Sequence, residues 1–342
     1  MARQTAIAKL TLLCNPMRNQ SIDTSKGFLL LLVIVGHILQ GSFTESLPRY
    51  LIYGFHMPMF MAISGFLFSA NYFKITTHTW IKKTTSRALL PWVLAVIIFT
   101  VYLKFVGYYQ QSSPQLIIES LTKPFYHLWF IPAWIAYQAA IRWMEKHQFN
   151  IRQFLLASCL ISTAAAWLQI SGQVLIPTQE IPIIGEILYS LRPQFFLFFV
   201  LGYVVKNHPN SLPHVLSKTL QHPIHSIIAL GIFTTQFFYT NPLINNAELI
   251  KTSINVLVFF YLNLSFLAYG IPIIAANKLP KSPLLHWIGN QSLLIYLWHP
   301  MAILFARYTI SYKPTPEFYF SSITSTITIL VIIYFYDRYR NP

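Results

Sequence analysis

The sequence predicts an all-α fold: a polytopic membrane helix bundle of about ten transmembrane helices with both termini cytoplasmic. Three observations predict this fold class. The chain of 342 residues is 55% hydrophobic and only 10% charged, which is outside the usual range of soluble globular domains. Apolar stretches long enough to cross a hydrocarbon core of about 30 Å recur along the whole chain. The positively charged residues also fall mainly on one of the two sides that such helices would define.

The predicted spans are apolar stretches of the length that a membrane helix needs, roughly 17 to 25 residues. They lie near residues 24–42, 50–73, 88–109, 126–144, 152–171, 188–205, 224–241, 252–276, 284–306 and 318–336. The longest polar connections, rich in Pro, Gln and Ser, are predicted as loops at 110–123, 171–185 and 206–222.

Lys and Arg residues set the orientation of these spans, because they accumulate in short cytoplasmic loops. With both termini inside, the outer side holds only Arg49, Lys104, Lys123, Arg192, Lys251, Arg307 and Lys313. The net charge of +15 is therefore spread over the inner loops and does not form one basic groove-binding face. We expect contact with membrane lipids, including anionic headgroups, and no nucleic-acid partner.

One membrane domain is expected at residues 22–342, after a cytoplasmic arm at residues 1–21 and with no appended soluble domain. The apolar patch in the arm is too short for a signal peptide and lacks a convincing cleavage site. The positions of Cys14 and Cys159 suggest no disulfide, and no Cys/His spacing typical of a metal site occurs. These features predict a multi-pass protein of the inner (plasma) membrane of the cell.

Lys26 and His37 lie on the same face of the first predicted span. Eleven residues bring a helical side chain back to within about 20° of the same direction, roughly 16 Å further along the axis. The Lys26 cation at the membrane surface is therefore expected to point in the same direction as the His37 imidazole near mid-bilayer. Ionisable groups at this depth are costly, so we interpret the pair as functional, with a histidine satisfied by a neighbouring helix as the alternative. Asp23 is expected to cap the helix and to hold Lys26 in place.

Topology places four of the 11 histidines at mid-membrane or in the outer half, on four different spans. They are His37, His56, His127 and His299. We expect them to converge on one cavity. His56 precedes Pro58 and the small pair Ser64-Gly65, which predicts a pocket that a helix or ligand can approach closely. For His56 itself, a second catalytic base and a structural hydrogen-bond donor remain equal alternatives.

Two further segments carry candidate binding residues. Ser292, Tyr296 and His299 are four and then three residues apart, so they share one face of the ninth span and are expected to face a cavity. An aromatic belt is the alternative there, but belts lie at the interfaces. His127 and Trp129 are predicted at the outer interface, where an aromatic belt is favoured over acceptor binding.

Three blocks of residues carry a family resemblance. They are Lys26-x10-His37 with Asp23 before the lysine, the Phe60 to Phe66 string around Ser64-Gly65, and the Asn290-x-Ser292-Leu-x-x-Tyr296-Leu-x-His299 run. Together they resemble the acyltransferase type 3 family of integral-membrane acyltransferases. Its fucose O-acetylase-like branch is most similar to the short segments Gly36-His37, His56-Met57-Pro58, His127-Leu128-Trp129-Phe130 and Phe196 to Tyr203.

The resemblance implies an O-acyltransferase of ten helices that takes an acyl group, usually acetyl, from cytoplasmic acyl-CoA. The acceptor it implies is a hydroxyl of a cell-surface glycan, such as lipopolysaccharide or another polysaccharide, or of its lipid-linked precursor. Many members carry an additional periplasmic esterase-like domain. This chain ends at Pro342 without one, so direct acylation or a separate partner is expected. Lys26 stands where the family often has Arg, and it supplies charge without the bidentate fork.

The residues and the resemblance predict one mechanism. The anionic nucleotide of acetyl-CoA, a donor co-substrate and not a tightly bound cofactor, would rest on Lys26, Asp23 and the open N–H groups of the first helix. His37 would act as general base, because a neutral imidazole with a pKa near 6.5 accepts a hydroxyl proton at neutral pH; an acyl-histidine is the variant. His56 and His299 are the other candidate catalytic residues, and His127, Trp129, Ser64, Ser292 and Tyr296 are candidates for substrate binding.

Two other classes of protein remain as alternatives. A multi-pass transporter or flippase of a small solute or glycan precursor also uses buried histidines and Pro-broken helices. Such a protein is expected to have matching interrupted helices in its two halves, and no such symmetry relates residues 1–170 to 171–342. A catalytically idle scaffold would not need Lys26, His37 and the polar stripe ending at His299 together.

Overall fold

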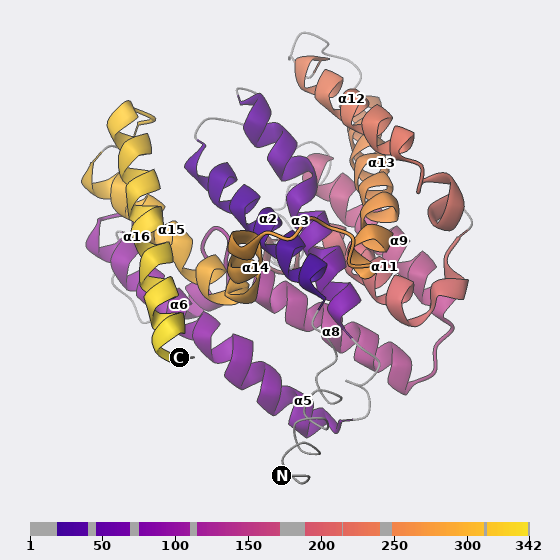
Figure 1. Ribbon diagram of the computed structural model, residues 1–342, viewed down its shortest axis with the longest axis horizontal. Helices are drawn as coiled ribbons and strands as arrows, with labels where there is room; N and C mark the ends of the chain where they lie inside the picture. Colours follow the sequence, from indigo (N-terminus) through magenta and orange to yellow (C-terminus); the bar gives the residue numbers. More distant parts are fainter. Residues whose placement is uncertain are drawn as a thin grey trace, which may run out of the picture.

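The structure, a computed structural model, describes residues 19–39, 46–68, 75–109, 115–171, 189–213, 215–239, 248–310 and 313–340. These residues form helices and connecting turns, with no strand among them (Figure 1). The predicted all-α fold is therefore confirmed. Nearly all of the predicted arm at residues 1–21 lies outside the described residues.

The helices follow the predicted spans in order. They are α2 (Gln20–Ile38), α3 (Leu47–Leu67), α5 (Thr77–Thr84), η1 (Thr85–Leu89), α6 (Leu90–Phe105), α7 (Gln115–Thr122), α8 (Phe130–Lys146), α9 (Ile151–Ser171), η2 (Pro193–Phe195), α11 (Phe196–Asn207), η3 (Pro209–Ser211), η4 (Val215–Thr219), α12 (Pro223–Tyr239), α13 (Glu248–Ala275), α14 (Pro283–Asn290), α15 (Ser292–Thr309) and α16 (Pro316–Arg340). In the described residues, 6 helical segments are long and apolar enough to cross a membrane, which supports a multi-pass membrane protein. The count of ten spans and the cytoplasmic termini stay predictions.

Several predicted segments differ from the structure. The span expected at 284–306 is two helices, because α14 ends at Asn290 and the chain turns at Gln291 before α15 begins. The stretches 110–123 and 206–222, predicted as loops, contain the short helices α7, η3 and η4. The third span extends toward its N-terminus through α5 and the π-helical turn η1, so that one helical segment runs from Thr77 to Phe105.

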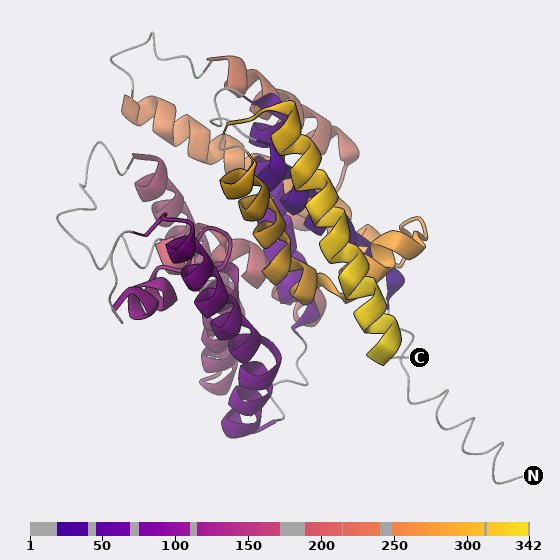
Figure 2. The same ribbon diagram turned by 90° about the vertical axis from the view of Figure 1, so that its left-hand side faces the viewer.

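Figures 1 and 2 show the arrangement of the bundle. α2 and α3 pack against each other near its centre, α15 and α16 lie side by side on one flank, and α12 packs against α13 on the other. Since α2 packs against both α3 and α15, these contacts bring His37, His56 and His299 from distant parts of the sequence toward one site.

Glycines allow the closest helix crossings. A Cβ added at Gly27 of α2 would collide with the Leu285 carbonyl of α14, and one added at Gly289 would collide with the Asp23 carbonyl. Small residues let helix backbones approach closely in membrane bundles. The crossing fixes the start of α2, with Asp23 and Lys26, against α14.

A second close crossing holds α3 against α11. A Cβ at Gly65 would collide with the Phe199 carbonyl, so the expected close approach of a helix at Ser64-Gly65 is observed. Pro58 lacks an N–H and frees the carbonyl of Gly54 within α3. Asn263 of α13 donates its Nδ2–H to that carbonyl at 2.9 Å, which satisfies it inside the bundle.

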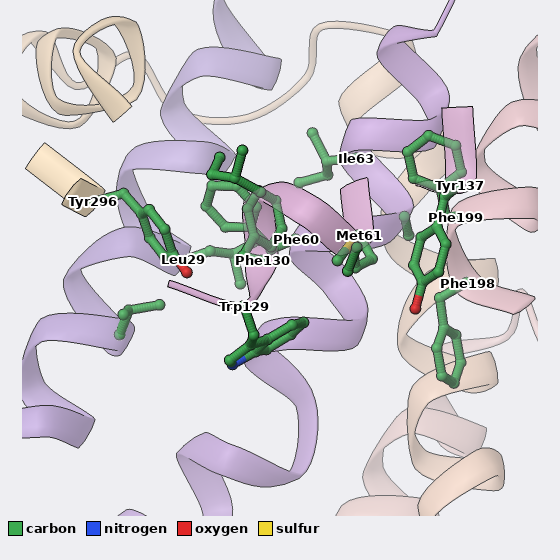
Figure 3. Packing of buried hydrophobic residues seen from close by; sticks show 14 of the residues in the cluster. Leu29, Phe60, Met61, Ile63, Trp129, Phe130, Tyr137, Phe198, Phe199 and Tyr296 are labelled. Atoms are coloured by element: carbon green, nitrogen blue, oxygen red, sulfur yellow. The ribbon is translucent and has the colours of Figure 1, made fainter. Parts of the chain in front are cut away.

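Aromatic residues fill the core between these helices. Figure 3 shows part of the main apolar cluster, with Tyr296 on one side of the view, Phe60 and Phe130 in the middle, and Tyr137 and Phe199 on the other side. The ring centroids of Phe130 and Tyr296 are 5.4 Å apart, and those of Phe60 and Phe130 are also 5.4 Å apart. This packing fixes the position of Tyr296 relative to the candidate site.

Candidate functional site

Three of the candidate histidines form one cluster. The rings of His37 of α2 and His299 of α15 are nearly parallel, with an interplanar angle of 13° and centroids 5.1 Å apart, and His37 Nδ1 lies 3.0 Å from His299 Nε2. The ring of His127, in the turn before α8, lies 6.0 Å from His37 and 5.5 Å from His299. All are buried. The structure thus brings together imidazoles that are far apart in the sequence.

His56 lies near this cluster. The ring of Tyr53 is within 6.4 Å of the His37 ring and 5.0 Å of the His56 ring. His56 Nδ1 lies 2.6 Å from the Ile52 carbonyl oxygen, which only accepts hydrogen bonds, so Nδ1 carries the proton. His56 therefore donates a hydrogen bond to its own helix, and its Nε2 retains a lone pair in the neutral ring. Among the described residues, no group of His, Cys, Asp and Glu side chains is arranged to hold a metal ion.

A cavity of about 600 Å³, here named the His37 cavity, adjoins the cluster. Its lining residues are Val33, His37, Arg49, Tyr50, Tyr53, Gly54, His56, Met57, Tyr126, His127, Trp129, Gln169, Arg192, Gln194, Phe195, Phe233, Phe259 and Tyr296. This volume is within the range of small-molecule sites. The lining combines aromatic rings, imidazoles, amides and two guanidinium groups.

A second cavity of about 400 Å³, named the Lys26 cavity, is lined by three cations: Lys26 of α2, Lys83 of α5 and Arg87 of η1. Ser64 and Ser292 also line it, as do apolar side chains. No Asp or Glu is among its described lining residues. The π-helical turn η1 is a type of irregularity that is frequent at functional sites.

Asp23 positions Lys26 but does not cap the helix. The side chain of Asn19 caps α2, because this helix begins at Gln20 and so includes Asp23 in its first turn. Asp23 Oδ1 lies 2.9 Å from Lys26 Nζ, and the carboxylate is almost fully buried. The predicted cap is therefore wrong, whereas the ion pair has the geometry that holds Lys26 in place.

The first amides of α2 are already occupied. The Ser21 N–H donates to Asn277 Oδ1 at 2.9 Å, and the Ile22 N–H donates to Asn19 Oδ1 at 3.3 Å. Ordinary anion sites at helix ends need open N–H groups. An anion in the Lys26 cavity would thus depend on the cationic side chains and not on the helix end, contrary to the prediction.

Tyr296 is common to the two cavities, alone among their described lining residues. Its hydroxyl donates to the carbonyl of His127. The ring packs on Phe130, as Figure 3 shows. Of the predicted polar stripe, Ser292 therefore lines the Lys26 cavity and Tyr296 lines both cavities. His299 lines neither cavity and contacts His37 instead.

The aromatic-belt interpretation of His127 and Trp129 is wrong. They are only 4% and 8% exposed, and both line the His37 cavity. Their segment is a turn entered through a positive φ of 55° at Tyr126, and the Trp92 indole donates to the Leu128 carbonyl at 2.8 Å. This turn directs the side chains inward, which the hydropathy of the segment does not indicate.

Sequence reasoning treated four site residues only as topology signals. Arg49 and Arg192 line the His37 cavity, and Lys83 and Arg87 line the Lys26 cavity. The sequence nevertheless contains one feature that marks each pair as candidate site residues. Arg49 and Arg192 are cations on the predicted outer side, which holds the smaller share of Lys and Arg. Lys83 and Arg87 are four residues apart and therefore share a helix face.

The fold and these cavities define a multi-pass membrane protein with a buried histidine cluster at an aromatic cavity, which shares Tyr296 with a cationic cavity. The family model of an acyltransferase domain, Acyl_transf_3, matches residues 19–335. The chain therefore belongs to the acyltransferase type 3 family and is a membrane acyltransferase. This membership favours an enzyme over the transporter, flippase and scaffold alternatives.

Two curated relatives are similar to part of the chain. The nodulation protein NolL of Mesorhizobium japonicum is 30% identical over 162 residues, which are 45% of this chain and 43% of that protein. The nodulation protein NolL of Sinorhizobium fredii is 24% identical over 206 residues, 57% of this chain and 52% of that protein. The matches thus cover about half the length of these relatives. No solved structure matches the chain.

Proposed function

We propose that this acyltransferase moves an acetyl group from cytoplasmic acetyl-CoA to a hydroxyl of a cell-surface glycan or its lipid-linked precursor. It would do so in the inner (plasma) membrane, with His37 as general base. One observation carries the proposal: a cavity lined by cations and a cavity lined by the histidine cluster meet at Tyr296. A donor and an acceptor can therefore approach the same place from two sides.

The Lys26 cavity suits the donor. Coenzyme A carries several phosphate groups, and Lys26, Lys83 and Arg87 provide cations from three helical elements, α2, α5 and η1. Acetyl-CoA is then a co-substrate that leaves after each turnover, not a resident cofactor. Its narrow pantetheine arm would pass Tyr296 to reach His37, while Ser64 and Ser292 would contact the arm in the Lys26 cavity.

The hydrogen bonds of the histidine pair define the proton positions. His299 Nδ1 lies 2.9 Å from the Ile295 carbonyl oxygen, so Nδ1 carries the proton and donates it. In the neutral ring, His299 Nε2 then holds a lone pair and accepts from His37 Nδ1 at 3.0 Å. His37 is consequently the Nδ1–H tautomer, and its basic nitrogen is Nε2.

This tautomer gives each histidine a distinct role. His37 Nε2 takes the proton of the acceptor hydroxyl as its oxygen attacks the thioester carbonyl. The new C–O ester bond forms, the C–S bond breaks, and the thiolate of CoA takes the proton back from His37. His299 holds the ring in orientation and accepts more strongly from the imidazolium that forms. A base positioned in this way typically contributes 10² to 10⁴ in rate.

The acceptor would occupy the His37 cavity. His127 and Trp129 line it together with His56, whose Nε2 can accept a hydrogen bond from a second hydroxyl. We therefore assign His127 and Trp129 to acceptor binding and His56 to acceptor orientation. Tyr296 would contact both substrates at the point of transfer.

The test uses the full chain and the glycans of the cell that makes it. Mass spectrometry of the envelope glycans is expected to show an acetyl ester that is lost on deletion of the gene and restored by the wild type. His37→Ala should fail to restore it while still inserting into the membrane. His147→Ala, at an exposed histidine after α8, is the matched control and should restore it. Restoration by His37→Ala would refute the assignment.

A further inference from the structure

The His37 cavity carries positive charge that the proposed reaction does not require. Arg49 of α3 and Arg192 before η2 both line it, and no Asp or Glu is among its described lining residues. Cavities lined by one sign of charge attract ligands of the opposite sign. In the proposed function, the donor phosphates bind the cations of the Lys26 cavity. The positive charge of the His37 cavity is therefore evidence about the charge of the acceptor.

The backbone of Arg192 is held in an unusual conformation. Its φ is 46°, in the left-handed region that residues other than glycine rarely adopt. The buried Tyr137 hydroxyl lies 2.7 Å from the Leu191 carbonyl oxygen and 2.6 Å from that of Arg192, which fixes this turn. Strained residues persist where the surrounding structure holds them, and they cluster at ligand sites.

The guanidinium of Arg192 is supported by rings and not by a carboxylate. It lies 5.5 Å from the ring centroid of Trp129 and 5.0 Å from that of Tyr189. No ion pair to Arg192 is found among the described residues, and its Nε is buried without a hydrogen-bond partner there. The aromatic faces orient the planar group while leaving its charge to be neutralised by a ligand.

Gln194 supplies an independent observation beside it. This side chain is 5% exposed, lines the cavity and donates its Nε2–H to Gln169 Oε1. Its Oε1 is buried with no hydrogen-bond partner among the described residues. Unsatisfied buried acceptors are rare and costly. A hydroxyl donor from a ligand in the cavity would satisfy this oxygen.

We infer that the acceptor is an anionic saccharide, one that bears a phosphate or a carboxylate near the acetylated hydroxyl. The planar fork of Arg192 binds the anion through two N–H groups, Arg49 adds a second positive charge, and Gln194 Oε1 accepts from a sugar hydroxyl. A neutral saccharide would leave Arg192 without a counter-ion. This inference rests on the proposed function, since it identifies the substrate class of the same site.

The test measures ligand binding to the purified full chain in nanodiscs of neutral lipid. The probes are glucose 1-phosphate, glucuronate and methyl glucoside at matched ionic strength, with the shift in the thermal unfolding midpoint as readout. At least one anionic probe should stabilise the protein clearly more than methyl glucoside, and added salt should reduce the difference. Preference for the phosphate indicates a glycosyl phosphate, and preference for glucuronate indicates an acidic sugar.

Variants connect this preference to Arg192. Arg192→Gln should weaken binding of the anionic probe by roughly tenfold or more, and Arg192→Lys should retain part of it. Arg152→Gln removes a positive charge at an exposed position of α9 and should have no effect. CoA binding is measured on the same samples and should be unchanged in the three variants. Unchanged CoA binding also shows that each variant is folded.

The outcomes separate the two proposals. If CoA binds but the three probes bind alike, or if Arg192→Gln keeps the anionic preference, the inference about the acceptor is overturned while the proposed function stands. If the wild type fails to bind CoA, the proposed function itself fails. In cells, an acetyl ester confined to neutral glycans would overturn the inference, and an ester on a phosphate-bearing or acidic glycan would support it.

Discussion

Removing His299 should lower the rate of acyl transfer without weakening either substrate. In the wild type, His299 Nε2 accepts from His37 Nδ1 at 3.0 Å, and under the proposed mechanism this bond would strengthen as His37 becomes an imidazolium in the transition state. His299 is fully buried and lines neither cavity. His299→Ala thus removes an interaction that acts through His37 and touches neither donor nor acceptor.

The size of the effect follows from the hydrogen bond that is lost. A hydrogen bond to a charged group contributes about 1.5 to 3 kcal/mol, which corresponds to roughly 10- to 150-fold in kcat. KM for both substrates should change little, because the interaction is made mainly in the transition state. His299→Gln places an amide oxygen near His37 Nδ1 and should recover part of the loss.

The assay is transfer of labelled acetyl from acetyl-CoA to the acceptor by the full chain in vesicles, over a range of both substrate concentrations. Donor binding by the same variants controls for folding, since His299→Ala also leaves a buried space. Unchanged kcat in His299→Ala would refute the assigned tautomers. So would a rise in KM with kcat preserved, because it would make His299 a binding residue.

Three other predictions concern Tyr296, the Lys26 cavity and the helix crossing at Gly289. Tyr296→Ala should join the two cavities and admit water, so that hydrolysis of acetyl-CoA rises relative to acyl transfer. Tyr296→Phe should keep the ratio of hydrolysis to transfer near that of the wild type. The measurement compares the release of free CoA with the formation of ester. Lys83→Ala and Arg87→Ala should each raise KM for acetyl-CoA by roughly tenfold with kcat little changed, and KM should depend less on salt. A fall in kcat with unchanged KM in steady-state kinetics would exclude Lys83 and Arg87 from donor binding. Gly289→Ala should lower the thermal unfolding midpoint, because its Cβ collides with the Asp23 carbonyl; Gly231→Ala in α12, where a Cβ meets nothing within 4 Å, is the control, and equal midpoints would contradict the crossing.

The sequence could predict what depends on local pattern. Apolar length located the helices, and helical spacing placed Lys26 and His37 on one face; the structure adds that the two residues line different cavities. Helical spacing also aligned Ser292, Tyr296 and His299. These predictions need only the rise and the rotation of an α-helix.

The rest depends on partners that the sequence does not pair. The inward turn of His127 follows from the positive φ of Tyr126 and from hydrogen bonds donated by Trp92 and Tyr296, which lie far away in the chain. The break at Gln291 leaves the apolar character of the segment unchanged, so hydropathy does not show it. The position of Arg192 likewise depends on Tyr137.

Helix α2 connects the two halves of the site. Lys26 lines one cavity and His37 the other, and eleven residues of one helix separate them by roughly 16 Å along its axis. The crossing of Gly27 and Gly289 fixes the Lys26 end against α14, and the bond to His299 fixes the His37 end against α15. A donor held by its phosphates at Lys26 would therefore present its thioester at a set distance. In the proposed mechanism, that distance would bring the thioester to Tyr296 and His37, with His299 orienting the His37 ring.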